Sequence, residues 1–220
     1  MNKSRRWLVI FCIVVIADLI ITATGNEGLR FYTKPLLIPT LMRFYFFSIS
    51  KQNSLSKLML AGLFFSFLGD VFLLWDNYFI PGLICFLTTH VLYIIYFIKT
   101  ANQSSWHLKK YPLLIVPVSA YTMALLWVLL PSLGALTVPV VIYATVISIM
   151  LLASINLFTK IKSPAYIYFI AGAALFVLSD SLLAINKFYQ PFEYAGIAIM
   201  LTYCAAQYLI VKGSIYQINN

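Results

Sequence analysis

Long apolar stretches along this chain are separated by short polar connections. A transmembrane helix needs about 20 consecutive apolar residues. Stretches of this kind cover residues 7–24, 32–49, 56–75, 79–98, 111–130, 134–158, 164–186 and 190–211. Two connections, Asp76-Asn77 and Pro131-Ser132, are short enough for antiparallel hairpins. No stretch has the ten-residue alternation of a membrane β-strand. The pattern therefore predicts an all-α integral membrane protein with eight transmembrane helices.

Composition agrees with this pattern. Hydrophobic residues make up 62% of the 220 residues and charged residues only 10%, whereas a soluble domain carries about 25% charged residues. Linkers rich in Gly, Pro or Ser are absent from the sequence, so residues 1–220 are expected to form one integral domain, with possible halves 1–100 and 101–220. The basic N-terminus precedes an apolar stretch without a clean cleavage site, which favours an uncleaved first membrane helix.

The net charge of +9 is unevenly distributed between the two predicted membrane faces. The face of the N-terminus carries eleven basic residues: Lys3, Arg5, Arg6, Lys51, Lys57, Lys99, Lys109, Lys110, Lys160, Lys162 and Lys212. The opposite face carries only Arg30, Lys34 and Lys187, with three nearby acids, Glu27, Asp76 and Glu193. By the positive-inside rule both termini are cytoplasmic, as expected for a multi-pass protein of a bacterial inner membrane. Nucleic-acid binding is not expected, because no basic face with interleaved aromatics lies outside the spans.

Two of the apolar stretches contain an aspartate. Asp70 lies within residues 64–75 (FFSFLGDVFLLW), and Asp180 lies within residues 172–185 (GAALFVLSDSLLAI). An ionised Asp at the centre of a membrane helix costs a few kcal/mol, so such residues indicate function. Gly62 precedes Asp70 by eight residues, as Gly172 precedes Asp180, which places each pair on one helical face. The two helices lie four spans apart, so the likeness predicts a parallel duplication of four-helix halves.

Other polar residues are expected at a similar depth. The two aspartates fall roughly 7–11 Å beneath the outer helix ends at about 1.5 Å per residue. Lys34 lies near the outer start of the second predicted span, while His90, Tyr203 and Gln207 lie near the midplane. These groups come from five predicted helices. They indicate a polar pocket that opens toward the outer face of the membrane.

Five short motifs, in order from about Tyr32 to Gln207, together resemble the YhhN-like lysoplasmalogenase family. They are Tyr32-Thr33-Lys34-Pro35, Gly69-Asp70, the set Gly82, Phe86, His90 and Tyr93, the pair Gly172 and Phe176, and Ser179-Asp180. The resemblance implies a multi-pass enzyme that needs no cofactor and hydrolyses the vinyl-ether bond of lysoplasmalogens. Its products would be a fatty aldehyde and glycerophosphocholine or glycerophosphoethanolamine.

Vinyl-ether hydrolysis needs two chemical groups. A general acid protonates the β-carbon, and a second group stabilises the resulting oxocarbenium ion or deprotonates the attacking water. Two carboxylates in different surroundings supply both roles in glycoside hydrolysis, which has a similar transition state. We therefore expect one of Asp70 and Asp180 to be the acid, and the other to be kept ionised by Lys34 or His90.

The remaining candidates have supporting roles. Lys34 either reaches toward the interface or holds the lipid phosphate, and Tyr93, Tyr203 and Gln207 are candidates for substrate contact. Ser179 is expected to support helix packing, because neither a Ser-His-Asp order nor a G-x-S-x-G elbow surrounds it. A metal site is not expected, since two Asp and one His lack the usual ligand spacing. The cysteines, Cys12, Cys85 and Cys204, are expected to pack as small hydrophobes.

Two other function classes fit the same features. Buried acids and parallel repeats also mark proton- or cation-coupled transporters. A lipid-binding scaffold would use the polar pocket to hold a head group without chemistry. Transport sites often lie at helices broken by Gly or Pro, and neither aspartate stretch contains Pro, which favours the hydrolase.

Overall fold

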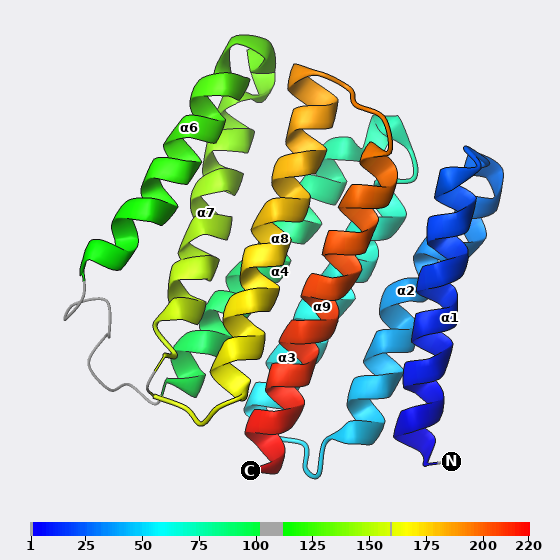
Figure 1. Cartoon of the computed structure of the whole chain (residues 1–220), viewed down its shortest axis with the longest axis vertical. Coiled ribbons are helices and arrows are strands. Elements are labelled where there is room, and N and C mark those ends of the chain that lie inside the picture. The colour runs from blue at the N-terminus through cyan, green and yellow to red at the C-terminus, as the bar shows by residue number, and fades with distance from the viewer. Residues whose placement is uncertain (1, 102–111, 159) are drawn as a thin grey trace.

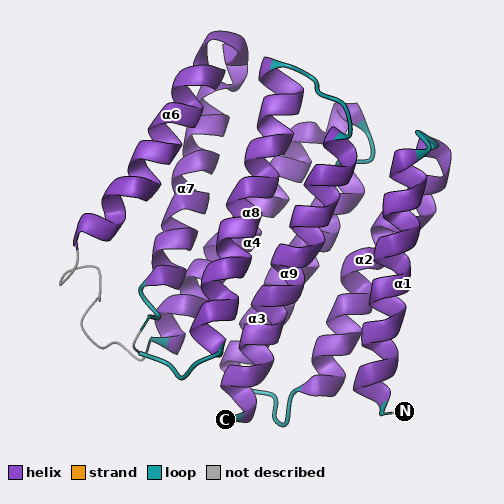
Figure 2. Ribbon diagram, viewed as in Figure 1, coloured by secondary structure: helices purple, strands orange, loops and turns teal. Residues whose placement is uncertain are grey.

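The computed structural model describes residues 2–101, 112–158 and 160–220, and these residues form long helices joined by short connections (Figure 2). Within this part of the chain no strand is present. The short 3₁₀ or π segments are η1 (Asp76–Tyr78), η2 (Pro112–Leu114), η3 (Gly134–Leu136) and η4 (Ile185–Tyr189). The long helices are α1 (Lys3–Ala23), α2 (Glu27–Ser48), α3 (Ser54–Phe72), α4 (Phe79–Thr100), α6 (Ile115–Leu133), α7 (Thr137–Ile155), α8 (Ala165–Ala184) and α9 (Ala195–Asn219).

The helices lie side by side with their long axes roughly aligned (Figure 1). Helix α3 packs along α4, and α8 packs along α9, to form the centre of the bundle. Helices α1 and α2 flank this centre on one side, where α2 contacts α3 and α9. Helices α6 and α7 flank it on the other side, where α7 contacts α4 and α8. Each flanking pair therefore meets both central pairs.

Six helical stretches are long and apolar enough to cross a membrane. They are Lys3–Ala23, Ser54–Phe72, Asp76–Thr100, Pro112–Ile155, Ala165–Tyr189 and Ala195–Asn219. The fourth stretch contains both α6 and α7, and the more polar α2 is not among the six. Large apolar side chains such as Ile13, Met123 and Trp127 face outward with 59%, 71% and 79% of their surface exposed. The chain is therefore a helical membrane protein whose apolar exterior suits lipid, and the finer count of eight spans stays a prediction.

Some helix boundaries differ from the predicted ones. Helix α2 begins at Glu27 instead of residue 32, because the Asn26 side chain caps it by accepting from the Leu29 N–H. A cap needs no apolar residue, so the hydrophobic pattern alone missed this start. The prediction that Arg30 lies in a loop is therefore wrong. Lys34, predicted at the start of the helix, lies about two turns inside it.

Helices α6 and α9 also begin or end elsewhere than predicted. The Pro131-Ser132 pair, predicted as a connection, lies in the last turn of α6, and the chain turns instead at Gly134, whose φ is +51°. Glycine tolerates this left-handed backbone without a steric cost. Helix α9 starts at Ala195 instead of residue 190 and continues to Asn219. The predicted positions of Lys109 and Lys110 lie outside the described residues.

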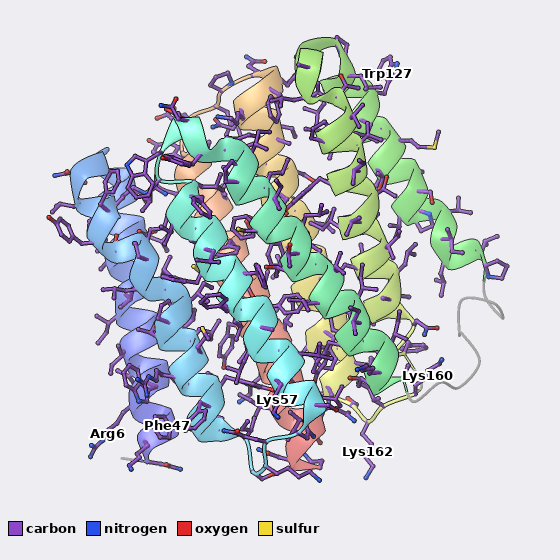
Figure 3. The ribbon with its side chains drawn as sticks, turned by 180° about the vertical axis from the view of Figure 1, so that it is seen from behind. Arg6, Phe47, Lys57, Trp127, Lys160 and Lys162 are labelled. Carbon is purple, nitrogen blue, oxygen red and sulfur yellow. The ribbon has the colours of Figure 1, made fainter. Side chains whose placement is uncertain are left out.

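The two ends of the bundle differ in charge. Both chain termini lie at one end (Figure 1), and Arg6, Lys57, Lys160 and Lys162 lie at this same end (Figure 3). Trp127 lies near the opposite end, as do the connections η1 and η4 (Figures 1 and 3). This distribution agrees with the predicted positive side of the membrane.

Glycines allow the central helices to approach closely. A Cβ added to Gly172 of α8 would lie 2.9 Å from the Ala206 carbonyl oxygen of α9. A Cβ added to Gly62 of α3 would lie 2.5 Å from the Tyr93 ring of α4. Small residues at such contacts let helix backbones pack tightly in membranes. The glycine that precedes each aspartate by eight residues thus fixes its helix against a neighbour.

Candidate functional site

A polar cavity of about 250 Å³ lies at the end of the bundle opposite the termini. Helices α2, α3, α4, α8 and α9 form its walls, together with η1 and η4. Its polar lining residues are Arg30, Lys34, Asp70, Asp76, Ser179, Asp180, Asn186, Lys187 and Tyr203. The two aspartates singled out by the sequence, 110 positions apart, therefore meet at one cavity.

Asp70 is almost completely buried, with 2% of its surface exposed. The Tyr203 hydroxyl of α9 donates a hydrogen bond to its Oδ2 at 2.8 Å. The Tyr203 ring packs edge-on against Phe86 and Phe176, with ring centroids 5.8 and 5.5 Å away. These aromatic contacts fix the hydroxyl in place, so Tyr203 holds the carboxyl group of α3 at the cavity wall.

Asp180 is less buried and has two polar neighbours. The Tyr143 hydroxyl of α7 donates to its Oδ2 at 2.5 Å. The His90 Nε2 atom of α4 lies 3.3 Å from the same oxygen and 2.9 Å from the Tyr143 hydroxyl. The side chain of Asp180 has 16% of its surface exposed, whereas that of His90 has none. Three helices thus contribute to this cluster, which we call the Asp180 cluster (His90, Tyr143 and Asp180).

The geometry of the Asp180 cluster indicates the tautomer of His90. The Tyr143 hydroxyl donates its proton to Asp180, so it cannot also donate to His90 Nε2. The contacts of Nε2 with Tyr143 and Asp180 are therefore hydrogen bonds when Nε2 itself carries a hydrogen. The Nδ1 atom is buried and has no hydrogen-bond partner among the described residues. The arrangement therefore indicates that His90 donates from Nε2.

Two cations of α2 face the carboxylates. Arg30 and Lys34 are four residues apart, which places them on one face of the helix, and both line the cavity. Lys34 is buried, with 7% of its surface exposed. The sequence analysis identified Lys34 but assigned Arg30 to a loop; their four-residue spacing is the signal that could have joined them. Together they supply positive charge to the cavity that the carboxylates line.

Two predicted contact residues lie away from the cavity. The Tyr93 hydroxyl donates to Gln207 Oε1 at 2.8 Å, and Gln207 Nε2 donates to Ser66 Oγ at 2.8 Å. These side chains form a buried polar cluster between α3, α4 and α9, and neither Tyr93 nor Gln207 lines the cavity. Ser179 does line it, but its hydroxyl donates to the Ile199 carbonyl of α9 at 3.0 Å. Its hydrogen bond joins α8 to α9.

Two further polar residues were missed by the sequence analysis. Tyr143 lies in the apolar segment VVIYATVI, where a phenolic hydroxyl needs a buried partner, and that is the signal that could have found it. Asp18 of α1 is 1% exposed, and its Oδ1 accepts from the Thr33 hydroxyl at 2.7 Å. The argument applied to the other two membrane aspartates would also have selected Asp18. Asp18 does not line the cavity.

Metal ligands are not grouped in the described part of the chain. No cluster of three or more His, Cys, Asp or Glu side chains there could hold an ion. Cys85 and Cys204 are buried free thiols, and Cys12 is an exposed one. The polar groups that line the cavity are three carboxyls, two hydroxyls, one amide and three cations.

Comparison with known proteins decides the family. The chain matches the YhhN family over residues 29–214. It belongs to this family. The match includes both aspartates and every cavity-lining residue, and it confirms the resemblance drawn from the sequence motifs.

The chain is similar to several named relatives. It is 35% identical over 161 residues to lysoplasmalogenase TMEM86A of Bos taurus, an alignment that covers 70% of this chain and 64% of the relative. It is 32% identical to lysoplasmalogenase TMEM86B of Homo sapiens, over 76% of this chain and 67% of the relative. A lysoplasmalogenase of Mycobacterium bovis is 29% identical over 63% of this chain and 52% of its own length. No solved structure shows a significant match.

Proposed function

We propose that this protein is a membrane hydrolase that cleaves the vinyl-ether bond of lysoplasmalogens. The observation that carries the proposal is the cavity in which Asp70 and Asp180 lie together with Arg30 and Lys34. The names of the relatives support the same reaction. A lysophospholipid has one hydrocarbon chain and an anionic phosphate, so it suits a membrane cavity that contains cations.

We assign the acid role to Asp70 and the carboxylate role to Asp180. Tyr143 and His90 direct hydrogens toward Asp180 Oδ2. A carboxyl oxygen that receives two donors is the stronger acceptor when the group is ionised, so this arrangement favours the Asp180 carboxylate. Asp70 is more deeply buried than Asp180, and it accepts a hydrogen bond from Tyr203. A carboxyl group that is more completely removed from water retains a proton more readily. This difference in surroundings separates the two roles.

The proposed reaction begins when Asp70 transfers its proton to the β-carbon, which leaves an oxocarbenium ion beside the Asp180 carboxylate. Water adds to the cationic carbon and gives a proton to Asp180, forming a hemiacetal. The hemiacetal then loses its hydroxyl proton to Asp70, and the departing glycerol oxygen takes the proton from Asp180. The C–O bond breaks, the products are a fatty aldehyde and the glycerophospho alcohol, and both carboxyl groups return to their starting states.

For the membrane arrangement we propose eight spans in two parallel four-helix halves, with both termini cytoplasmic. Each predicted span overlaps a described helix. The helix contacts favour the duplication, because α2 meets α3 and α9 as α7 meets α8 and α4. Under this topology the cavity opens on the outer side. We propose a bacterial inner membrane as the location, on the positive-inside pattern of the loops.

The deciding experiment is a product assay with the purified protein in detergent. Release of aldehyde from a lysoplasmalogen, and none from the saturated ether analogue, is expected because only the vinyl ether can be protonated at carbon. Asp70→Asn and Asp180→Asn should each lower turnover at least 100-fold, while Glu193→Gln, at an exposed carboxylate that does not line the cavity, should not. Equal cleavage of both substrates would exclude this mechanism. Proton-coupled uptake without hydrolysis would identify a transporter, and binding without turnover a scaffold.

A further inference from the structure

Two narrow apolar hollows adjoin the polar cavity at Asp180. The first lies between α4, α7 and α8, and the second lies between α6, α7 and α8. Their volumes are about 40 and 50 Å³, against about 250 Å³ for the polar cavity. Asp180 lines all three spaces. It therefore stands at the boundary between a charged space and an apolar one.

The walls of the three spaces are continuous. Leu73, Phe79, Phe86 and Leu183 line both the polar cavity and the first hollow. Val140, Tyr143 and Ala184 line both the first and the second hollow. The series of spaces thus runs from the α2 side of the bundle, past Asp180, toward α6.

Most polar side chains in the two hollows already make hydrogen bonds within the protein. Asp180 is the one charged residue that lines either hollow. In the second hollow the hydroxyls of Ser148 and Ser181 donate to the carbonyl oxygens of Ala144 and Val177 in their own helices, and Thr122 donates to Val118. Groups bonded in this way offer a ligand little hydrogen bonding. The hollows therefore suit an unbranched hydrocarbon chain better than a charged head group.

We propose that these hollows, which we call the chain groove (the first and second apolar hollows together), bind the hydrocarbon chain of the lysophospholipid. The phosphate then lies near Arg30 and Lys34 of α2, and the bond between chain and glycerol lies at Asp180. This inference rests on the proposed function for the bond that is cut. It adds the orientation of the substrate, whose phosphate lies toward α2 and whose hydrocarbon chain runs toward α6. It also predicts that residues of α7 determine selectivity for chain length.

Charge and polarity favour this direction over the reverse. A phosphate placed in the chain groove would face the Asp180 carboxylate without a cation among the lining residues. A hydrocarbon chain placed in the polar cavity would remove water from the cations of Arg30 and Lys34. Removal of charged groups from water costs more than the apolar contacts return. The proposed direction avoids both penalties.

Photolabelling tests the site without requiring turnover. The probe is a saturated lysophosphatidylethanolamine with a diazirine near the end of its chain, bound to the full-length protein in detergent and mapped by peptide mass spectrometry. Labels are expected on α7 and α8, near Val140 and Ala184, and excess unlabelled lysophosphatidylethanolamine should remove most of them. Glycerophosphoethanolamine, which has no chain, should not. Labels confined to α2 or α9, or labels that no lysolipid displaces, would overturn the proposal, the second result indicating ordinary membrane lipid.

Chain-length selectivity gives a second test. Val140→Phe fills the groove where its two hollows meet, so it should lower kcat/KM for a 16-carbon lysoplasmalogen about 10-fold or more, relative to an 8-carbon one. Val138→Phe is the matched control, because this α7 residue is 66% exposed whereas Val140 is 7% exposed. An unchanged ratio in a folded Val140→Phe protein would contradict the groove.

A second pair of variants tests the same groove in case Val140→Phe does not fold. Ala184→Leu narrows the same groove from α8, and Ala174→Leu, on an exposed face of α8, is its control. If the wild-type protein releases no aldehyde but the competed label lies on α7 and α8, the chain groove stands and the proposed reaction fails. If aldehyde is released and the label lies elsewhere, the reaction stands and the groove fails.

Discussion

At the scale of single residues, the two membrane aspartates differ in what surrounds them. Asp70 accepts a hydrogen bond from Tyr203 of α9, while Asp180 has Tyr143 of α7 and His90 of α4 at one of its oxygens. All these donors come from neighbouring helices and not from the helix that carries the acid. The character of each carboxyl group is therefore a property of helix packing, and one change on another helix should alter it.

Tyr143→Phe is the sharpest test at this scale. It removes the donor 2.5 Å from Asp180 Oδ2 and keeps the ring that packs edge-on with His90. A hydrogen bond to a charged group contributes about 1.5–3 kcal/mol. We therefore expect turnover to fall roughly 10- to 100-fold.

The control for this variant is Tyr32→Phe, at a tyrosine that is 74% exposed. It should retain wild-type turnover in the same aldehyde assay. If Tyr143→Phe is as active as Tyr32→Phe, the hydroxyl of Tyr143 has no part in positioning or stabilising Asp180.

At the scale of elements, the central helix pairs α3–α4 and α8–α9 carry the two acids. Each pair packs through a glycine that lies about two turns from the aspartate on its helix. Because membrane helices associate through close packing and not through a hydrophobic driving force, the loss of a small residue at such a contact is costly. The eight-residue spacing between each glycine and its aspartate is thus a packing feature, and it sets the position of each acid along the bundle axis.

Gly172→Ala tests this interpretation. The new Cβ would meet Ile210 Cγ1 at 2.7 Å and the Ala206 carbonyl oxygen at 2.9 Å, and the backbone of α9 cannot move away locally. We expect a loss of about 1–3 kcal/mol in stability, seen as a lower unfolding temperature in detergent.

Gly28→Ala provides the comparison for the same substitution. A Cβ at Gly28 of α2 would meet one atom, Asn26 Oδ1, at 3.5 Å. Its unfolding temperature should be unchanged or slightly raised, because alanine has the higher helix propensity. Equal effects of the two substitutions would mean that Gly172 does not hold α8 against α9.

At the scale of the whole molecule, the cavity and the basic connections beside the termini lie at opposite ends of the bundle. The termini share an end with Lys57, Lys160 and Lys162, and the cavity lies by η1 and η4 at the other end (Figures 1 and 3). If the charged end is cytoplasmic, a head group would reach Arg30 and Lys34 from the outer leaflet. The orientation therefore determines which leaflet supplies the substrate.

Cysteine labelling in intact cells measures this orientation. In a background with Cys12, Cys85 and Cys204 replaced by Ala, a membrane-impermeant maleimide should label Asp76→Cys. It should label Lys162→Cys only after the membrane is made permeable, because basic connections stay on the cytoplasmic side. Labelling of Lys162→Cys in sealed cells with protection of Asp76→Cys would reverse the proposed topology.

Several features of this protein could be predicted from the sequence because they are properties of the chain in one dimension. The lengths of apolar stretches predict membrane helices, and a carboxylate inside such a stretch costs so much that it needs polar partners wherever its helix packs. The all-helical structure of the described residues and the family membership are confirmed. Boundaries were less accurate, since a cap such as Asn26 or a turn such as Gly134 leaves no apolar signal.

The partners of the acids could be decided only by the tertiary structure. Tyr143 lies 37 positions from Asp180 and His90 lies 90 positions from it, so their meeting depends on how α4, α7 and α8 pack. The same packing places Arg30 in the cavity and withdraws Tyr93 and Gln207 from it. A sequence states which residues are costly to bury in lipid. The rotation of each helix about its axis, set by side-chain packing with its neighbours, determines which of them share one cavity.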